Sequence, residues 1–335
     1  MTGVLLLNLG GPDSLDAVRP FLYNLFSDRD IIKLGPAFLQ KPLASFISTT
    51  RAGKTRGMYR LIGGKSPILD ITKAQAASLE EALNARSALA DNPYRVYVGM
   101  RYWHPFIEES VERMRRDGIS DIVALTLYPH YSIATTGSSI ITLEKAVMEI
   151  YRADPTQCRE TCENSSYTIH CPHFSLRCIT SWYKHPLYIE ALEERIRSGF
   201  TLFKEQPEVL FSAHSLPQKF IDDGDPYLKE IQGTIAAITK KIDMRWHLSF
   251  QSKSGPVKWL EPSTEKMIEE LAQRGVKDLL VVPISFVSDH IETLYEIDIL
   301  YKDMAAGLGI NLKRTKSLNT SPAFIKALAA IVSGV

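Results

Sequence analysis

The chain has 335 residues, a length that suits one large domain or two domains of ordinary size. Its 45% hydrophobic and 23% charged residues are typical of a globular protein with a proper core. The formal net charge of +1, without a long run of Lys and Arg, argues against a nucleic-acid partner.

The N-terminus carries a short apolar run, Val4–Leu7, with no basic segment before it and no small-residue cleavage site after it. Such a run is too short for a signal peptide or a membrane span, and it predicts a buried strand. We therefore expect a cytoplasmic protein, either free or peripherally associated with a membrane.

Short apolar segments recur along the chain, with amphipathic stretches between them. Most of the apolar segments lack strict alternation, which is typical of parallel strands covered by helices on both faces. The stretches 105–116 and 264–274 place apolar residues at helical spacing. The predicted strands are Val4–Leu9, Arg95–Met100, Asp121–Leu127, Tyr167–His170, Val209–Ser212, His247–Gln251 and Leu279–Ile284.

Strands that alternate with helices predict an α/β, doubly wound fold with a parallel sheet, in which ligands bind at the carboxyl ends of strands. Two helix–turn–strand units resemble each other, because Gly118 or Gly275 ends the helix and an Asp precedes the strand. They indicate two similar lobes with a cleft between them, although any two such units share these features to some degree. The predicted limits are an N-terminal lobe at 1–150, a connecting segment at 151–178 and a C-terminal lobe at 179–335.

Residues 20–58 break the alternating pattern, since they mix aromatic, aliphatic and basic residues with Gly and Pro. Core helices would account for part of this mixture. An apolar lip over a flat hydrophobic ligand, in contact with a membrane surface, accounts for it better.

The four cysteines are clustered. Cys158, Cys162, Cys171 and Cys178 fall within 21 of the 335 residues, in a segment that lacks regular periodicity. In a reducing compartment a disulfide is the weaker explanation of such clustering, and a metal or cluster held by thiolates is the stronger one.

A histidine follows the predicted strand 209–212. His214 lies in the motif SAHSLP, in the turn beyond the strand. A histidine at the carboxyl end of a strand in an α/β protein is well placed for acid–base or metal chemistry. The alternative is a structural histidine that is hydrogen-bonded within the turn.

The motif SDHIETLYE follows the predicted strand 279–284 and begins a helix. Asp289 as N-cap with Glu292 three residues later would form a capping box, which needs no chemistry. In the functional interpretation, His290 and Glu292 line a cleft at the start of the helix, with Glu296 one turn further on the same face. An imidazole and carboxylates suit a borderline divalent metal such as Fe²⁺. The sequence alone leaves both interpretations open.

Eight stretches of the chain, taken together and in order, resemble the ferrochelatase family along nearly its whole length. The resemblance implies two Rossmann-like lobes, a porphyrin cleft and insertion of Fe²⁺ into a porphyrin. The stretches are LLNLGGPDS (6–14), YRLIGGKSPI (59–68), GMRYWHP (99–105), TLYPHYSIATTGSS (126–139), LFSAHSLP (210–217), GDPY (224–227), FQSKSGPVKWLEP (250–262) and PISFVSDHIETLYEID (283–298).

The reaction that the resemblance implies requires a base, because two protons must leave pyrrole nitrogens as iron enters. Neutral His is a side chain with a suitable pKa for this step. The resemblance places His214 as proton acceptor, as Fe²⁺ ligand or as both, and Glu292 as the second metal-side residue. His290 would support Glu292, and Glu296 would extend an acidic route for iron and protons.

The resemblance also names residues for the porphyrin pocket. Aromatic side chains suit the face of a macrocycle, and Arg suits a carboxylate. Ordinary packing or a surface charge is the alternative for each of these residues. The residues implied are Arg101, Tyr128, Trp259 and Arg60, with Lys65 as a further partner for propionates.

The cysteines match a bacterial type of the family with an internal four-cysteine insert. Animal members instead carry cysteines on a C-terminal extension and after the YPxYS motif, where this chain has Ile133. Four thiolates are the usual ligands of a [2Fe–2S] cluster, so the resemblance implies one on Cys158, Cys162, Cys171 and Cys178. A zinc site that includes His173, and free or disulfide-bonded cysteines, are the alternatives.

We therefore expect a lyase of haem biosynthesis that inserts Fe²⁺ into protoporphyrin IX to give protohaem and two protons, without a nucleotide cofactor. Coproporphyrin III is the alternative substrate, since both rings share a core. A non-catalytic tetrapyrrole- or metal-binding protein is the alternative from another class. A cobalt or nickel chelatase is a third.

Overall fold

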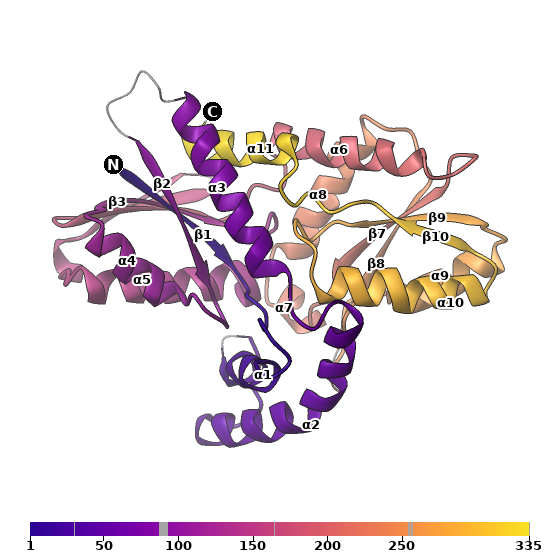
Figure 1. Ribbon diagram of the computed structural model, residues 1–335, viewed down its shortest axis with the longest axis horizontal. Helices are drawn as coiled ribbons and strands as arrows, with labels where there is room; N and C mark the ends of the chain where they lie inside the picture. Colours follow the sequence, from indigo (N-terminus) through magenta and orange to yellow (C-terminus); the bar gives the residue numbers. More distant parts are fainter. Residues whose placement is uncertain (30, 87–92, 164, 254, 256, 335) are drawn as a thin grey trace. The chain divides into compact units, whose positions relative to one another are not determined.

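The computed structural model describes residues 1–29, 31–86, 93–163, 165–253, 255 and 257–334, whose elements are shown in Figure 1. They form two compact units. The first unit runs from Met1 to Trp182 and includes the C-terminal residues from Ile325, and the second runs from Tyr183 to Phe324. The domain limits given above, with 151–178 as a connecting segment, stay a prediction.

The described part of the first unit holds a six-stranded sheet in the order β2-β1-β3-β6-β5-β4. Its first four strands are parallel, and β5 and β4 follow as antiparallel neighbours. The strands predicted in this part of the chain are confirmed, whereas the sequence patterns do not predict β4 or β6. The strands are β1 (Thr2–Asn8), β2 (Tyr94–Met100), β3 (Asp121–Thr126), β4 (Arg159–Glu163), β5 (Ser166–Cys171) and β6 (Phe174–Ile179).

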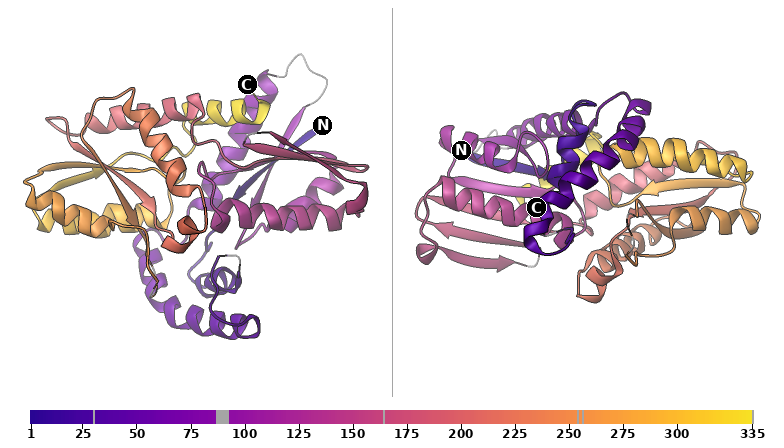
Figure 2. Two further views of the ribbon diagram at one scale, coloured as in Figure 1. Left: turned by 180° about the vertical axis from the view of Figure 1, so that it is seen from behind. Right: turned by 90° about the horizontal axis from the view of Figure 1, so that it is seen from below.

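Helices cover both faces of this sheet. Figures 1 and 2 show α4 (Ile107–Arg116) and α5 (Ser138–Ile150) together on one face and α3 (Ile68–Arg86) on the other. On α4, Ile107, Val111 and Met114 are spaced by four and then three residues, so they share one face and are fully buried in the core. Gly118, two residues after the end of α4, has a φ of 76°, and the N–H of Ile119 donates back to the carbonyl of Met114.

The second unit repeats this design with a parallel sheet. Its four described strands lie in the order β10-β9-β7-β8, so β8-β7-β9-β10 matches β2-β1-β3-β6. The helices α4 and α9, which carry the two similar sequence units, both precede the third strand of their sheet. The predicted α/β, doubly wound fold is therefore confirmed. The strands are β7 (Glu208–His214), β8 (Trp246–Gln251), β9 (Asp278–Pro283) and β10 (Asn311–Arg314).

The helices of the second unit also pack on its sheet. Apolar residues of α9, η4 and α10 form one core cluster with β9 and β10. The element η4 is π-helical, a rare form that is frequent at functional sites. The helices are α6 (Pro186–Phe200), α7 (Gln218–Asp222), α8 (Tyr227–Thr239), α9 (Thr264–Gln273), η4 (Glu292–Tyr301) and α10 (Lys302–Gly307), and α11 (Pro322–Ser333) leads back into the first unit.

The segment 20–58 of the first unit forms α1 (Val18–Ser27), the short η1 (Ala37–Leu39) and most of α2 (Gln40–Leu61). The buried side chain of Gln40 ties the connection together by donating to the carbonyls of Phe26 and Ile32, each at 2.7 Å. Phe38 and Phe46 remain 77% and 67% exposed. No helix among the described residues combines the length and apolar character needed to cross a bilayer.

The geometry of β4, β5 and β6 corrects the prediction of a four-cysteine ligand set. The antiparallel pairing of β4 with β5 brings Cys158 against Cys171, and the two form a disulfide. Cys162 is exposed, whereas Cys178 is buried in the core, and burial raises the pKa of the Cys178 thiol to about 12. The four sulfurs are therefore not available together as thiolates, and neither a [2Fe–2S] cluster nor a zinc site with His173 is supported.

Candidate active site

His214 is the last residue of β7, two residues beyond the predicted end of that strand. The extra pairing comes from β8, where His214 lies beside Gln251. Its backbone N–H donates to Ser285 Oγ at 3.0 Å, and its carbonyl accepts from the Tyr227 hydroxyl at 3.0 Å. The backbone of His214 is thus held on both sides, at the carboxyl end of a strand where the chain order of the sheet reverses.

Glu292 is the first residue of η4 and is the partner of His214. Its Oε2 lies 2.8 Å from His214 Nδ1. The capping box is therefore wrong: the backbone N–H of Asp289 donates to Asn319 Oδ1 at 2.9 Å. The carboxylate that a capping box would turn back along the helix instead reaches a strand 78 residues away in the sequence.

Glu296 lies beside this pair, about one helical turn after Glu292 in η4. Its Oε2 accepts hydrogen bonds from Ser252 Oγ at 2.5 Å and from Gln251 Nε2 at 3.1 Å. The same amide nitrogen donates to the backbone carbonyl of Glu292 at 3.0 Å. Gln251 therefore holds one turn of η4 against the end of β8.

His290 completes the group from the segment before η4. Its Nδ1 lies 3.0 Å from the carbonyl of Ser288, and its Nε2 lies 3.8 Å from Glu292 Oε2. The ring of Phe286 packs near both imidazoles, with its centroid 4.3 Å from that of His290 and 6.3 Å from that of His214. The expected grouping of His214, His290, Glu292 and Glu296 is thus present in the geometry of the second unit.

The acid–base properties of these groups depend on one another. Burial disfavours the charged imidazole, yet the Glu292 carboxylate and Glu296 raise the pKa of His214 above its ordinary value. Burial opposes the ionised form of Glu292, but His214 and His290 lower its pKa below the usual range. Burial and the charge of Glu292 raise the pKa of Glu296 to about 7. The site therefore combines a hydrogen-bonded imidazole–carboxylate pair with a carboxyl group that exchanges its proton near neutral pH.

Several residues of this group escape sequence reasoning. Gln251, Ser252, Tyr227, Ser285 and Phe286 come from three separate segments, and ordinary packing would explain each of them in a sequence. The only signal for the first two is the stretch FQSKSGPVKWLEP, which contributes to the family resemblance.

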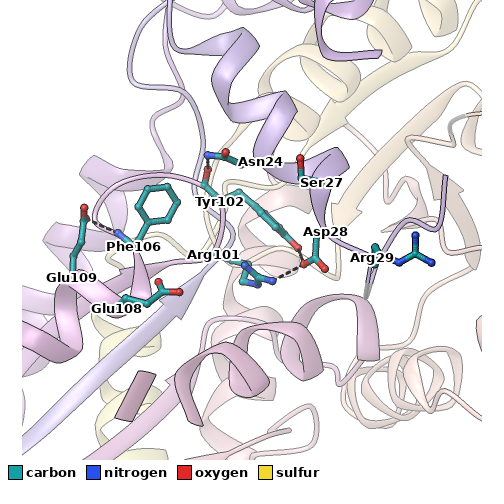
Figure 3. Close-up of a pocket in the computed structure, with 9 residues that line it drawn as sticks. All are labelled: Asn24, Ser27, Asp28, Arg29, Arg101, Tyr102, Phe106, Glu108 and Glu109. Atoms are coloured by element: carbon teal, nitrogen blue, oxygen red, sulfur yellow. Dashed lines mark hydrogen bonds and ion pairs between the residues drawn. The ribbon is translucent and has the colours of Figure 1, made fainter. Parts of the chain in front are cut away.

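A pocket in the first unit contains one of the residues expected to bind the porphyrin. It has a volume of about 640 Å³ and lies between the end of α1, the end of β2 and the start of α4. Figure 3 shows Arg101 in its wall, where Nη2 donates to Asp28 Oδ2 at 2.7 Å, while Nε donates to Ser138 Oγ at 2.8 Å. The guanidinium thus forms an ion pair with Asp28, and only 19% of the Arg101 side chain is exposed.

The other residues expected to bind the porphyrin do not line this pocket. Tyr128 lies beyond β3, and burial raises the pKa of its hydroxyl. Arg60 is exposed on α2, and Lys65 forms an exposed ion pair with Asp70. Trp259 belongs to the second unit, where its half-buried indole faces the carbonyl of Gly255 at 3.5 Å.

His214 and Glu292 are two side chains rather than a complete set of metal ligands. Within the described parts of the chain, no group of three or more His, Cys, Asp or Glu side chains is arranged to hold a metal ion. A divalent metal at this pair would take its remaining ligands from elsewhere. The expected role of both residues toward Fe²⁺ stays a prediction.

The family model and the relatives found by sequence agree on one family. A family model described as ferrochelatase matches residues 1–334. A ferrochelatase of Geotalea uraniireducens is 51% identical, covering 99% of this chain and 97% of its own length. A ferrochelatase of Synechocystis sp. is 47% identical, covering 98% of this chain and 81% of its own length. Among solved structures, SirB from Bacillus subtilis with Fe³⁺ has a TM-score of 0.55 at 13% identity, covers 99% of this chain and 94% of its own, and shows the shared fold alone.

The ion pair predicts how the imidazole will titrate in a variant. Glu292→Gln removes the carboxylate charge but keeps a polar side chain of similar size. The pKa of His214 should fall, because burial then acts without the opposing charge. NMR titration of labelled histidine would measure the shift, with His247, which pairs with Glu208 at the other end of the strands, as an internal control. An unchanged His214 midpoint would contradict the pairing.

Proposed function

Because the chain belongs to the ferrochelatase family, whose members are lyases that insert Fe²⁺ into a porphyrin, we propose that its porphyrin is protoporphyrin IX. The reaction converts Fe²⁺ and protoporphyrin IX into protohaem and two protons, as the last step of haem biosynthesis. The observation that carries the residue roles below is the contact of 2.8 Å between His214 Nδ1 and Glu292 Oε2, with Glu296 next to them.

His214 is the base of this reaction. Glu292 holds Nδ1, so Nε2 is the ring nitrogen that can face a substrate. The carboxylate favours the protonated imidazole, which strengthens His214 as an acceptor for a pyrrole proton. Glu292 then compensates the positive charge that the proton brings.

Glu296 is the group that passes protons onward. Its pKa of about 7 makes gain and loss of a proton nearly equal in free energy at neutral pH. Glu292 and Glu296 also place negative charge where a dication must arrive, which favours the approach of Fe²⁺. His290 supports Glu292 from the preceding segment.

The periphery of the porphyrin distinguishes the two candidate substrates. Coproporphyrin III carries a propionate on each pyrrole, whereas protoporphyrin IX carries only two propionates and has apolar vinyl groups in place of the others. The pocket of the first unit is lined by two Arg side chains, Arg29 and Arg101, and by three carboxylates, Asp28, Glu108 and Glu109, which leaves little positive charge for additional propionates. This balance supports protoporphyrin IX. We assign Arg101 to a propionate and retain Tyr128, Trp259 and Arg60 as proposed porphyrin contacts.

The segment 20–58 is proposed to contact a membrane surface. Support comes from the two exposed rings of Phe38 and Phe46, on a segment that also carries Lys and Arg. Exposed aromatic residues next to basic ones are suited to the boundary between acyl chains and anionic headgroups. An apolar porphyrin that partitions into lipid would be available at such a surface.

Replacement of the base tests the assignment of the site. His214→Ala should lower kcat for insertion of Fe²⁺ or Zn²⁺ into protoporphyrin by roughly 10²- to 10⁴-fold, measured by the change in Soret absorbance. His247→Ala is the matched control, since it removes another histidine paired with a carboxylate in the same sheet. Unimpaired turnover in both His214→Ala and Glu292→Ala would refute the assignment.

A comparison of substrates tests the choice of porphyrin. The value of kcat/KM should be about tenfold or more higher for protoporphyrin IX than for coproporphyrin III, a difference of about 1.4 kcal/mol. Both rates would be measured anaerobically with Fe²⁺ under the same conditions. Faster turnover of coproporphyrin III would exclude protoporphyrin as the preferred substrate while leaving the metal-insertion activity in place.

Vesicle binding tests the membrane contact. Phe38→Ser and Phe46→Ser should each weaken co-sedimentation with vesicles that contain phosphatidylglycerol by about tenfold, the effect of losing about 1.5 kcal/mol of aromatic burial. Leu202→Ser, at another exposed apolar residue in the second unit, should bind as the unchanged protein does. Equal binding of all three variants would exclude this segment as the contact.

A further inference from the structure

Arg314 stands at the end of β10 and bonds to two carboxylates. Its Nη1 lies 3.0 Å from Asp289 Oδ1, whereas Nε and Nη2 lie 2.8 and 2.7 Å from the two oxygens of Asp298. Only 9% of the Arg314 side chain is exposed. Hydrogen bonds between a guanidinium and carboxylates in this geometry are among the stronger ones in proteins and are specific in direction.

The two carboxylates bracket the functional segment. Asp289 immediately precedes His290, and Asp298 follows Glu296 by two residues, so the three expected site residues of this segment lie between the two bonds. Asp289 is itself fixed by Ser317 Oγ at 2.7 Å and by Asn319 Nδ2 at 2.8 Å. The loop after β10 therefore holds the start of η4 at several points.

The element between these bonds needs such support. A π-helix is less favourable than an α-helix and persists where the surrounding structure fixes it. If η4 relaxed toward an α-helix, each residue would rotate by a different angle about the helix axis, so Glu296 would move relative to Glu292 and to the sheet, even though residues four apart would still share a face. His214 and Gln251, on β7 and β8, bind these carboxylates from a fixed sheet and could not follow such a rotation.

We propose that Arg314 is a positioning residue for metal insertion: by bonding Asp289 and Asp298 together, it keeps η4 π-helical and keeps Glu292 and Glu296 in place beside His214. This role rests on the proposed function of that site. Arg314 touches neither reacting group in this account and acts only through the segment that it holds.

Variants of Arg314 and of its partner Asp298 test the proposal. In Arg314→Met, kcat should fall roughly 10- to 100-fold, as expected when catalytic groups are misplaced, while KM for the porphyrin stays within about twofold. Arg314→Lys should recover part of the loss, because an ammonium keeps the charge but cannot form both directed contacts. Asp298→Asn weakens the ion pair between Arg314 and Asp298 at a more exposed residue, and it should also lower kcat. This variant tests the proposal if Arg314→Met does not fold.

Hydrogen exchange supplies a readout that does not depend on activity. Peptides that cover residues 289–298 should exchange faster in Arg314→Met and Asp298→Asn than in the unchanged protein. Arg197→Met is the matched control, because it breaks another Arg–carboxylate pair of the second unit, on α6, and should change neither kcat nor exchange in 289–298.

The outcomes separate the two proposals. Faster exchange together with lower kcat supports the positioning role of Arg314. Faster exchange with unchanged kcat would leave Arg314 only a structural role and would overturn the proposal. Unchanged exchange overturns it as well. If the unchanged protein inserts no metal into either porphyrin, the proposed function fails, and exchange in 289–298 still decides whether Arg314 fixes η4.

Discussion

The contact between His214 and Glu292 is the interaction on which the proposed chemistry of the second unit depends. A histidine alone at this depth would lose its proton readily, and a carboxylate alone would resist ionisation, because burial penalises both charged forms. Together they stabilise each other, while burial and the charge of Glu292 raise the pKa of Glu296 to about 7 against the opposing charge of His214. Removing one partner of such a buried pair leaves the other uncompensated, so both must be held closely in place. The surrounding hydrogen bonds provide that hold.

The fold supplies the pair by bringing together the ends of strands that are distant in sequence. β7 lies between β8 and β9, so the residues that follow these three strands meet at one edge of the sheet. His214 comes from β7, Gln251 from β8, and Ser285 and Glu292 from the segment after β9. The pair of His247 and Glu208 shows that a similar contact occurs elsewhere in the same sheet. The difference is its place at the amino ends of the strands, away from the edge where doubly wound folds bind ligands.

Sequence patterns could locate elements but not long-range partners. Apolar runs and helix-ending glycines predict the parallel strands and the turns at Gly118 and Gly275, because these signals are local. The short strand β4 is exposed along its whole length, and β6 alternates polar with apolar residues, so neither forms a continuous apolar run that the sequence would reveal. Glu292 fits a capping box in sequence, and only the tertiary position of His214 draws its carboxylate away. The spacing of the cysteines likewise gives no register, and it is the pairing of β4 with β5 that brings Cys158 against Cys171.

A site that binds a metal as a substrate differs from a site that holds a permanent metal cofactor. A resident zinc or cluster is held by a closed set of ligands, whereas iron on its way into a porphyrin must be released. In the described residues the candidate site offers the pair His214 and Glu292, not a closed set. Fe²⁺ also brings two positive charges while two protons leave, so the total charge is conserved only if protons can depart as iron arrives. In the proposed reaction, a dication near His214 and Glu296 would lower the proton affinity of both groups, which would couple the arrival of the metal to the release of the protons.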